Sequence, residues 1–295
     1  MLRQRLVAVL TRLYPLYSGC GTFANSKIIQ KLSGRTSELG WATITGGARA
    51  LVPLDDYIGR AMYFVGDLDR KVSWVCKRIV RPGDNVVDIG ANLGLIALQL
   101  ARLVGPSGRV HAFEPIPQLL GLLEQSIVRN GLRNIHLHRV ALGAEDGELE
   151  LWVPEHHAGR ASFVRMGNAT SKIRVPIKRL AEFSTQPGMD AIRLLKIDVE
   201  GFEPQVFNGA RSLFESRPPD AILFELNDTD VAPQHHPTIE FLRELGYRFL
   251  SIPKCYFRMR LVRYDPAKSE PPYSHDFLAV RVGATGDEIA ARVGA

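Results

Sequence analysis

The chain has 295 residues, of which 45% are hydrophobic and 23% are charged, so it can bury the core of a globular protein. Its net charge of +6 and its pI near 9.3 favour anionic partners but do not determine a fold. No basic stretch is interleaved with aromatic residues, so we expect no nucleic-acid partner. Three distant cysteines without a C-x-x-C pair indicate neither a disulfide framework nor a zinc knuckle, which favours a reducing cytoplasm.

The first residues form a basic amphipathic segment. Five apolar residues are spaced so that they can share one face of a helix: Leu2, Leu6, Val9, Leu10 and Leu13. The segment is too short and too interrupted to cross a bilayer. A helix packed on the domain, a transit peptide and a helix in peripheral contact with a membrane remain alternatives.

The next stretch changes from helical to extended patterning. Residues 1–40 predict one or two helices, and short apolar runs at 42–45, 50–54 and 61–65 predict strands of a small antiparallel cap. We therefore assign residues 1–68 to an N-terminal extension. Tyr57, Tyr63 and Asp67 are candidate pocket residues, with packing or turn roles as the alternative.

The main domain is expected over residues 69–285, followed by a C-terminal tail over residues 286–295. A helix from Asp69 to Val80 precedes a strand at 86–89, a glycine turn and a second helix at 95–104. The glycines allow the backbone to approach a ligand closely. This order indicates an open α/β domain.

The glycine turn indicates the class of ligand. Gly90 and Gly94 are separated by three residues, so the middle glycine of a dinucleotide fingerprint is missing. Asp88, two residues before the turn, suits a ligand that carries positive charge and no phosphate. S-adenosylmethionine, with an amino group and a sulfonium, is such a ligand.

The following strand also ends in an acid. It runs over residues 109–114, and Glu114 lies about 20 residues beyond the glycine turn, where a carboxylate can accept both hydroxyls of a ribose. Asp88 and Glu114 would then flank one crevice at the carboxyl edge of neighbouring parallel strands. The alternative is that Glu114 is a solvated acid at a strand end.

Three segments in this order, VVDIGANLG, GRVHAFEPIP and LLKIDVEGFEPQVFNGA, resemble the FkbM-type S-adenosylmethionine-dependent methyltransferases. The resemblance runs from about residue 69 to 225. It implies a Rossmann-like class I methyltransferase fold, with a seven-stranded, mostly parallel sheet in the order 3-2-1-4-5-7-6 and helices on both faces. It also implies methylation of a hydroxyl on a small molecule, glycan or polyketide.

The resemblance and the strand positions together give a candidate site. The residues expected to line the cofactor are Asp88, Gly90, Asn92, Gly94, Glu114 and Pro115, with Ala141 and Leu142 near the adenine. The strand expected at 194–201 carries Lys196, Asp198 and Glu200 on one side, and charges within a parallel strand are costly unless they are paired.

Asp198 and Glu200 are the catalytic candidates. A sugar-type hydroxyl is a poor nucleophile until a base removes its proton, and either acid can serve as that base. Lys196 would hold them ionised; a structural ion pair is the alternative. A magnesium site at Asp198, Glu225 and Asn227 fits oxygen chemistry, but nothing in the sequence requires it and we expect no metal.

The remaining pattern predicts further strands at 135–140, 148–153, 172–180, 221–227, 247–252 and 276–282. His136 and His138 point to the same side of the first of these, where packing is favoured over metal binding. Two other functions remain as alternatives. One is an NAD(P)-dependent oxidoreductase, which the missing glycine disfavours, and the other is a non-catalytic nucleotide-binding or scaffold protein.

Overall fold

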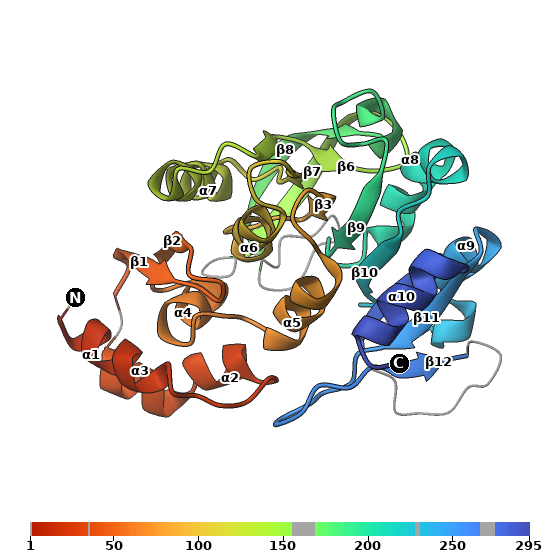
Figure 1. The fold of residues 1–295 in the computed structure, drawn as a ribbon. Helices are drawn as coiled ribbons and strands as arrows, with labels where there is room; N and C mark the ends of the chain where they lie inside the picture. The colour runs from red at the N-terminus through yellow and green to blue at the C-terminus, as the bar shows by residue number, and fades with distance from the viewer. Residues whose placement is uncertain (1, 35, 155–168, 228–230, 266–274) are drawn as a thin grey trace.

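The computed structural model describes residues 2–34, 36–154, 169–227, 231–265 and 275–295. Its main sheet has eight strands in the order β12-β11-β13-β10-β9-β3-β4-β5 (Figure 1). These strands are β3 (Asn85–Ile89), β4 (Arg109–Phe113), β5 (Ile135–His138), β9 (Ile192–Ile197), β10 (Ala221–Glu225), β11 (Tyr247–Ser251), β12 (Val262–Tyr264) and β13 (Asp276–Arg281). The expected order 3-2-1-4-5-7-6 is confirmed. The expected number of seven is one too low, because β12 adds a short edge strand.

Five neighbouring strands of this sheet pair in parallel, in the order β5-β4-β3-β9-β10. Strand β13 is antiparallel to both of its neighbours. Helices cover both faces of the sheet, as expected. One core cluster lies under α5 (Arg70–Ile79), α6 (Leu95–Val104), α7 (Pro117–Asn130) and α10 (Ala284–Arg292). A second lies under α8 (Glu203–Ser216) and α9 (Pro237–Glu244), and the 3-10 turn η3 (Pro233–His235) precedes α9. The fold is therefore the α/β class that the sequence predicts.

A separate three-stranded sheet has the order β6-β8-β7. Its strands are β6 (Ala141–Leu142), β7 (Gly147–Pro154) and β8 (Ala169–Lys178), and the 3-10 turn η2 (Leu180–Phe183) follows it. The predicted strands at 148–153 and 172–180 are β7 and β8. They pair with each other instead of joining the edge of the main sheet.

Within its described residues, the N-terminal region contains three helices before residue 40, where one or two were expected, and one hairpin. Its elements are α1 (Leu2–Thr11), α2 (Cys20–Ala24), α3 (Lys27–Ser33), β1 (Leu39–Thr43), β2 (Arg49–Pro53) and α4 (Tyr57–Phe64). The strand predicted at 61–65 is wrong, because these residues end α4. The Asp56 side chain caps this helix by accepting a hydrogen bond from Gly59 N at 2.8 Å.

The N-terminal region and the main domain share one hydrophobic core cluster, which contains Ile44 and Met62 as well as Val86 and Leu98. The boundary expected at residue 68 therefore lies within a continuous core. Residues 286–295, which we expected to be a tail, belong largely to α10 and bury Ile289 against this cluster.

The three candidate pocket residues of the extension serve packing. Tyr63 and Asp67 are buried, and Asp67 accepts a hydrogen bond from Ser73 Oγ at 2.7 Å. Tyr57 lies against Gly21. None of the three lines the cavity described below.

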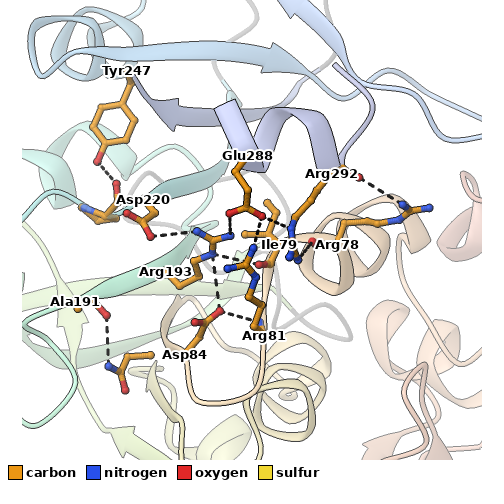
Figure 2. A network of polar contacts seen from close by, with 12 residues as sticks. Arg78, Ile79, Arg81, Asp84, Ala191, Arg193, Asp220, Tyr247, Glu288 and Arg292 are labelled. Atoms are coloured by element: carbon orange, nitrogen blue, oxygen red, sulfur yellow. Dashed lines mark hydrogen bonds and ion pairs between the residues drawn. The ribbon is translucent and has the colours of Figure 1, made fainter. Parts of the chain in front are cut away.

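A polar network ties the amino edge of the sheet to the last helix (Figure 2). Arg193 of β9 is 7% exposed and donates hydrogen bonds to Glu288 at 2.9 Å, to Asp220 at 3.3 Å and to the carbonyl oxygen of Ile79 at 3.2 Å. A third acid, Asp84, lies 3.8 Å from its Nε. Arg193 therefore connects β9, α10 and the end of α5.

Three histidines lie together on one face of the sheet. His111 of β4 stacks against His136 and His138 of β5, and Phe113 stacks on His138. Burial lowers the pKa of His138 to about 4, so its ring is neutral near pH 7. The rings therefore pack like aromatic side chains. Within the described ranges, no helix is long and apolar enough to cross a membrane.

Candidate active site

A cavity of about 560 Å³, including the space open to solvent at its mouth, lies where β3, β4 and β9 end. Eight of the ten residues that the sequence nominated line it: Gly90, Asn92, Glu114, Pro115, Ala141, Leu142, Asp198 and Glu200. The other two, Asp88 and Gly94, lie outside its lining. Open α/β sheets bind ligands at this edge, outside the carboxyl ends of the strands.

The glycine turn brings two strand ends into contact. Gly90 has φ 76°, and a Cβ added there would lie 2.0 Å from the carbonyl oxygen of Asp198. Gly94 has φ 83° and begins α6, where an added Cβ would meet Leu123 at 2.3 Å. Both glycines are needed for the backbone geometry. Gly94 does not line the cavity, but it allows α6 to begin close to Leu123 of α7.

Asn92 adopts a left-handed conformation with φ 52°, which is uncommon for a residue other than glycine. Its Oδ1 accepts a hydrogen bond from the N–H of Leu93 at 2.7 Å. Glu200 has the same kind of conformation, with φ 53°. Both residues line the cavity, and uncommon backbone conformations of this kind gather at ligand sites.

Glu114 is held by the backbone on both sides. One carboxylate oxygen accepts the N–H of Asn92 at 2.8 Å, and the other accepts the N–H of Ile116 at 2.9 Å. Burial raises the pKa of Glu114 to about 7, although these two hydrogen bonds oppose the shift. An ionised carboxylate has about four acceptor positions, so two remain available to a ligand.

Asp88 lies beneath the site. Its side chain is fully buried and lies 3.5 Å from Lys196 Nζ, which is also 3.5 Å from Asp198 and donates to the carbonyl oxygen of Gly90 at 3.2 Å. Although burial alone would lower it, Asp198 and Asp88 raise the pKa of Lys196 to about 12. The lysine therefore stays cationic and joins the glycine turn to the acidic turn after β9.

The turn after β9 is fixed by an acid that sequence reasoning did not assign. Glu203 is 1% exposed, and its Oε1 accepts the N–H of Val199 at 2.9 Å. Burial raises the pKa of Glu203 to about 7. This residue stands in the third motif, but only the fold shows that it reaches back to hold the chain between Asp198 and Glu200.

A further acid ends the neighbouring strand. Burial first, and then the charges of Asp198, Asp276 and Glu200, raise the pKa of Glu225 to about 8. One cation lies close by, since Lys71 Nζ is 2.7 Å from Asp276. No group of three or more His, Cys, Asp or Glu side chains in the described ranges is arranged to hold a metal ion.

Apolar residues also line the cavity. They include Ile116, Leu119 and Leu151, together with the two residues of β6. The lining thus combines carboxylates and backbone polar groups with aliphatic carbon. This combination suits a ligand with a polar ribose and amino-acid part and a flat base.

The sequence pattern of the methyltransferase FkbM domain matches residues 88–249. "Methyltransferase 1" of Beauveria bassiana is 27% identical over 43% of this chain and 59% of its own length. The 31-O-demethyl-FK506 methyltransferase FkbM of Streptomyces tacrolimicus is 30% identical over 44% of this chain and 60% of its own length. The chain therefore spans about 60% of the length of the curated relatives it matches.

Among solved structures, a SAM-dependent O-methyltransferase of Thermotoga maritima superposes with a TM-score of 0.40 and 15% identity, covering 88% of this chain and 97% of its own. The domain match spans more than half of the chain and includes the glycine turn, Glu114 and the acidic turn after β9. The chain belongs to the FkbM methyltransferase domain family, whose methyl donor is S-adenosylmethionine.

Proposed function

We propose that this protein transfers the methyl group of S-adenosylmethionine to a hydroxyl oxygen of a sugar, polyketide or related small molecule. The observation that carries the proposal is the cavity in which the glycine turn, Glu114 and the turn at Asp198 meet. The name of the Streptomyces relative specifies transfer to an oxygen, which supports the same chemistry here.

Three groups fit the cofactor. Glu114 has two acceptor positions left for ribose hydroxyls, Gly90 keeps the backbone open, and Ala141 and Leu142 provide an apolar surface for the adenine. When bound, S-adenosylmethionine supplies a methyl carbon activated by its sulfonium. The protein then has to orient an acceptor oxygen toward that carbon and accept the oxygen's proton.

Asp198 is the proposed base. Its side chain lines the cavity, is 40% exposed and can therefore contact an acceptor. Lys196 Nζ lies 3.5 Å from the carboxylate of Asp198, and its own pKa is raised to about 12, so a cation stands beside the proposed base. Glu200 lies two residues further on in the same lining and is proposed to orient the acceptor. Neighbouring Glu225 adds a group whose pKa of about 8 lets it exchange protons near neutrality.

The test is a transfer assay with S-adenosylmethionine carrying a ¹³C-labelled methyl group and a panel of hydroxylated sugars and polyketides. We expect a product whose labelled methyl resonance is that of a methyl ether. Asp198→Asn should keep cofactor binding and lose transfer. Label on nitrogen or carbon, or an Asp198→Asn rate equal to that of the wild type, would contradict the proposal.

A further inference from the structure

The first helix presents a row of apolar side chains to solvent. The exposed fractions range from 61% to 79% for Leu2, Leu6, Val9, Leu10 and Leu13. At 100° per residue these five positions fall in a stripe roughly 100° wide along one side of the helix. The sequence left open that this face packs on the domain. In the structure the face points to solvent instead.

The outward direction of the stripe is fixed by the opposite side of α1. The buried residues of this helix are Gln4, Val7, Ala8 and Thr11. Thr11 Oγ1 donates a hydrogen bond to the carbonyl oxygen of Phe64 at 2.6 Å, which ties the helix to α4. The helix therefore has one face that packs on the protein and a second apolar face that does not.

The net positive charge of the protein comes from its N-terminal sequence. The chain has 37 basic and 31 acidic residues, and residues 1–37 contain six of the basic ones and none of the acidic ones. The net charge of +6 therefore comes from the first 37 residues, and the remainder is balanced. On the helical projection Arg3 borders one side of the apolar stripe, while Arg5 and Arg12 border the other.

The neighbouring helix continues the same chemistry. Arg3 donates hydrogen bonds to the carbonyl oxygens of Lys31 and Leu32 at the end of α3. On α3, Ile28 is 70% and Leu32 51% exposed, and Lys27 and Lys31 are exposed beside them. Apolar and basic side chains therefore alternate on the surface of two helices in contact.

A loop from the far end of the sequence reaches the same region. The N–H groups of Tyr17 and Ser18 donate to the carbonyl oxygens of Tyr256 and Cys255, each at 2.9 Å, and Figure 1 shows this loop beside the N-terminal helices. The loop exposes 57% of Tyr256 and 80% of Phe257. The exposed Arg258 and Arg260 follow, in the basic group of the sequence.

We propose that α1 with Leu13, α3 and the loop at 254–260, here called the basic apolar face, bind the surface of an anionic phospholipid bilayer. Leucine side chains enter the boundary between headgroups and acyl chains, and the arginines and lysines meet lipid phosphates. Tyr256 and Phe257 supply the aromatic rings that favour the interface. The face would hold the protein beside a membrane without crossing it.

Charge decides between this occupant and a second copy of the chain. In a two-fold dimer the same face meets itself, so its seven basic residues in α1, α3 and the loop at 254–260 would lie against seven more, with no acid in these segments to offset them. An anionic lipid surface offers the opposite charge and an apolar interior to the same side chains. The observations therefore favour lipid.

The test is co-sedimentation of the full chain with large vesicles of phosphatidylcholine, with and without phosphatidylglycerol, at low and high salt. We expect binding to the anionic vesicles that weakens as salt rises, because the Debye length shortens. The double variant Leu6→Glu/Leu10→Glu should bind at least about tenfold more weakly. It lacks two apolar side chains that would enter the bilayer, and its new carboxylates are repelled by the anionic lipids.

The matched control is Val128→Glu, which changes an apolar residue that is 80% exposed on α7, outside the basic apolar face. It should bind vesicles like the wild type, and circular dichroism should show that all variants are folded. Equal binding by Leu6→Glu/Leu10→Glu and wild type would overturn the proposal, as would no binding to anionic vesicles. A wild-type dimer in sedimentation velocity that the double variant dissolves, without vesicle binding, would assign the face to a second copy.

Discussion

The strand β9 carries a basic residue near each end, and the two ends differ in how charge is balanced. At the amino end, Arg193 meets Asp84, Asp220 and Glu288 (Figure 2). At the carboxyl end, Lys196 meets Asp88 and Asp198, with further acids beyond them. The first arrangement is a closed network, and the second leaves acids in excess around a cavity.

The pKa values express this difference. Although burial alone would raise it, hydrogen bonding and charge from Arg193, with Arg292 and Arg81 nearby, lower the pKa of Glu288. At the other end, burial raises the pKa of Glu114 and Glu203 to about 7. The ionised form of Glu288 therefore adds stability at the amino edge, although burial raises the pKa of Asp84 there. The carboxyl edge keeps two acids that exchange protons near neutrality.

The largest expected effect comes from a substitution in the cavity at the carboxyl edge of the sheet. Asp198→Asn should lower kcat by roughly 10²- to 10⁴-fold, because the variant lacks the base that accepts the acceptor's proton. Initial rates with an acceptor that the wild type methylates measure this effect. The matched control, Asp220→Asn at the amino edge, should leave kcat unchanged. If both variants lose kcat equally, the two edges do not differ in function.

The next largest effect comes from a substitution in the polar network at the amino edge of the sheet. Arg193→Met should lower the free energy of unfolding by about 3 kcal/mol, because it removes the cation that pairs three acids. Urea denaturation measures the loss. Arg248→Met removes a more exposed partner of Asp287 and should cost less than about 1 kcal/mol. Equal losses in the two variants would show that the network adds no more than a surface pair.

The smallest expected effect is a pH-dependent change in stability when an acid near the carboxyl edge is replaced. The folded pKa of Glu225, about 8, lies above its ordinary value of 4.5, so the unfolded chain loses this proton first as pH rises. Its contribution to stability is therefore fully present below about pH 4.5 and is lost as pH rises toward 8. Glu225→Gln should be more stable than the wild type at pH 8, by on the order of 1–2 kcal/mol, and not at pH 4.5.

Denaturant unfolding of both proteins at the two pH values measures this difference. A stability difference that is equal at both pH values would mean that Glu225 does not hold a proton in the folded protein.

Local patterns were sufficient for much of the fold and of the cavity. The glycines at 90 and 94, and the acids at 114 and 198, lie close in sequence to the strands that precede them, so spacing together with the family resemblance predicted eight residues of the cavity lining. The strand at 61–65 was wrong because every side chain from Ala61 to Val65 is buried, which hides the period that separates a strand from a helix.

Long-range contacts could not be predicted in this way. Asp88 stands two residues before the glycine turn, yet only the packing of Lys196 over it explains why it lies outside the cavity. The raised pKa values of Glu203 and Glu225 come from burial and from acids on other elements. The outward turn of α1 also depends on its contact with α4.

The central claim is that the cavity at the carboxyl edge binds S-adenosylmethionine through Glu114. Calorimetric titration of S-adenosylhomocysteine into the wild type and Glu114→Ala at pH 8 tests it, with Arg193→Met as the folded control. The account predicts a Kd at least about tenfold weaker for Glu114→Ala, and a wild-type affinity that falls below pH 7 as the carboxylate is protonated. Equal affinity in wild type and Glu114→Ala would contradict it.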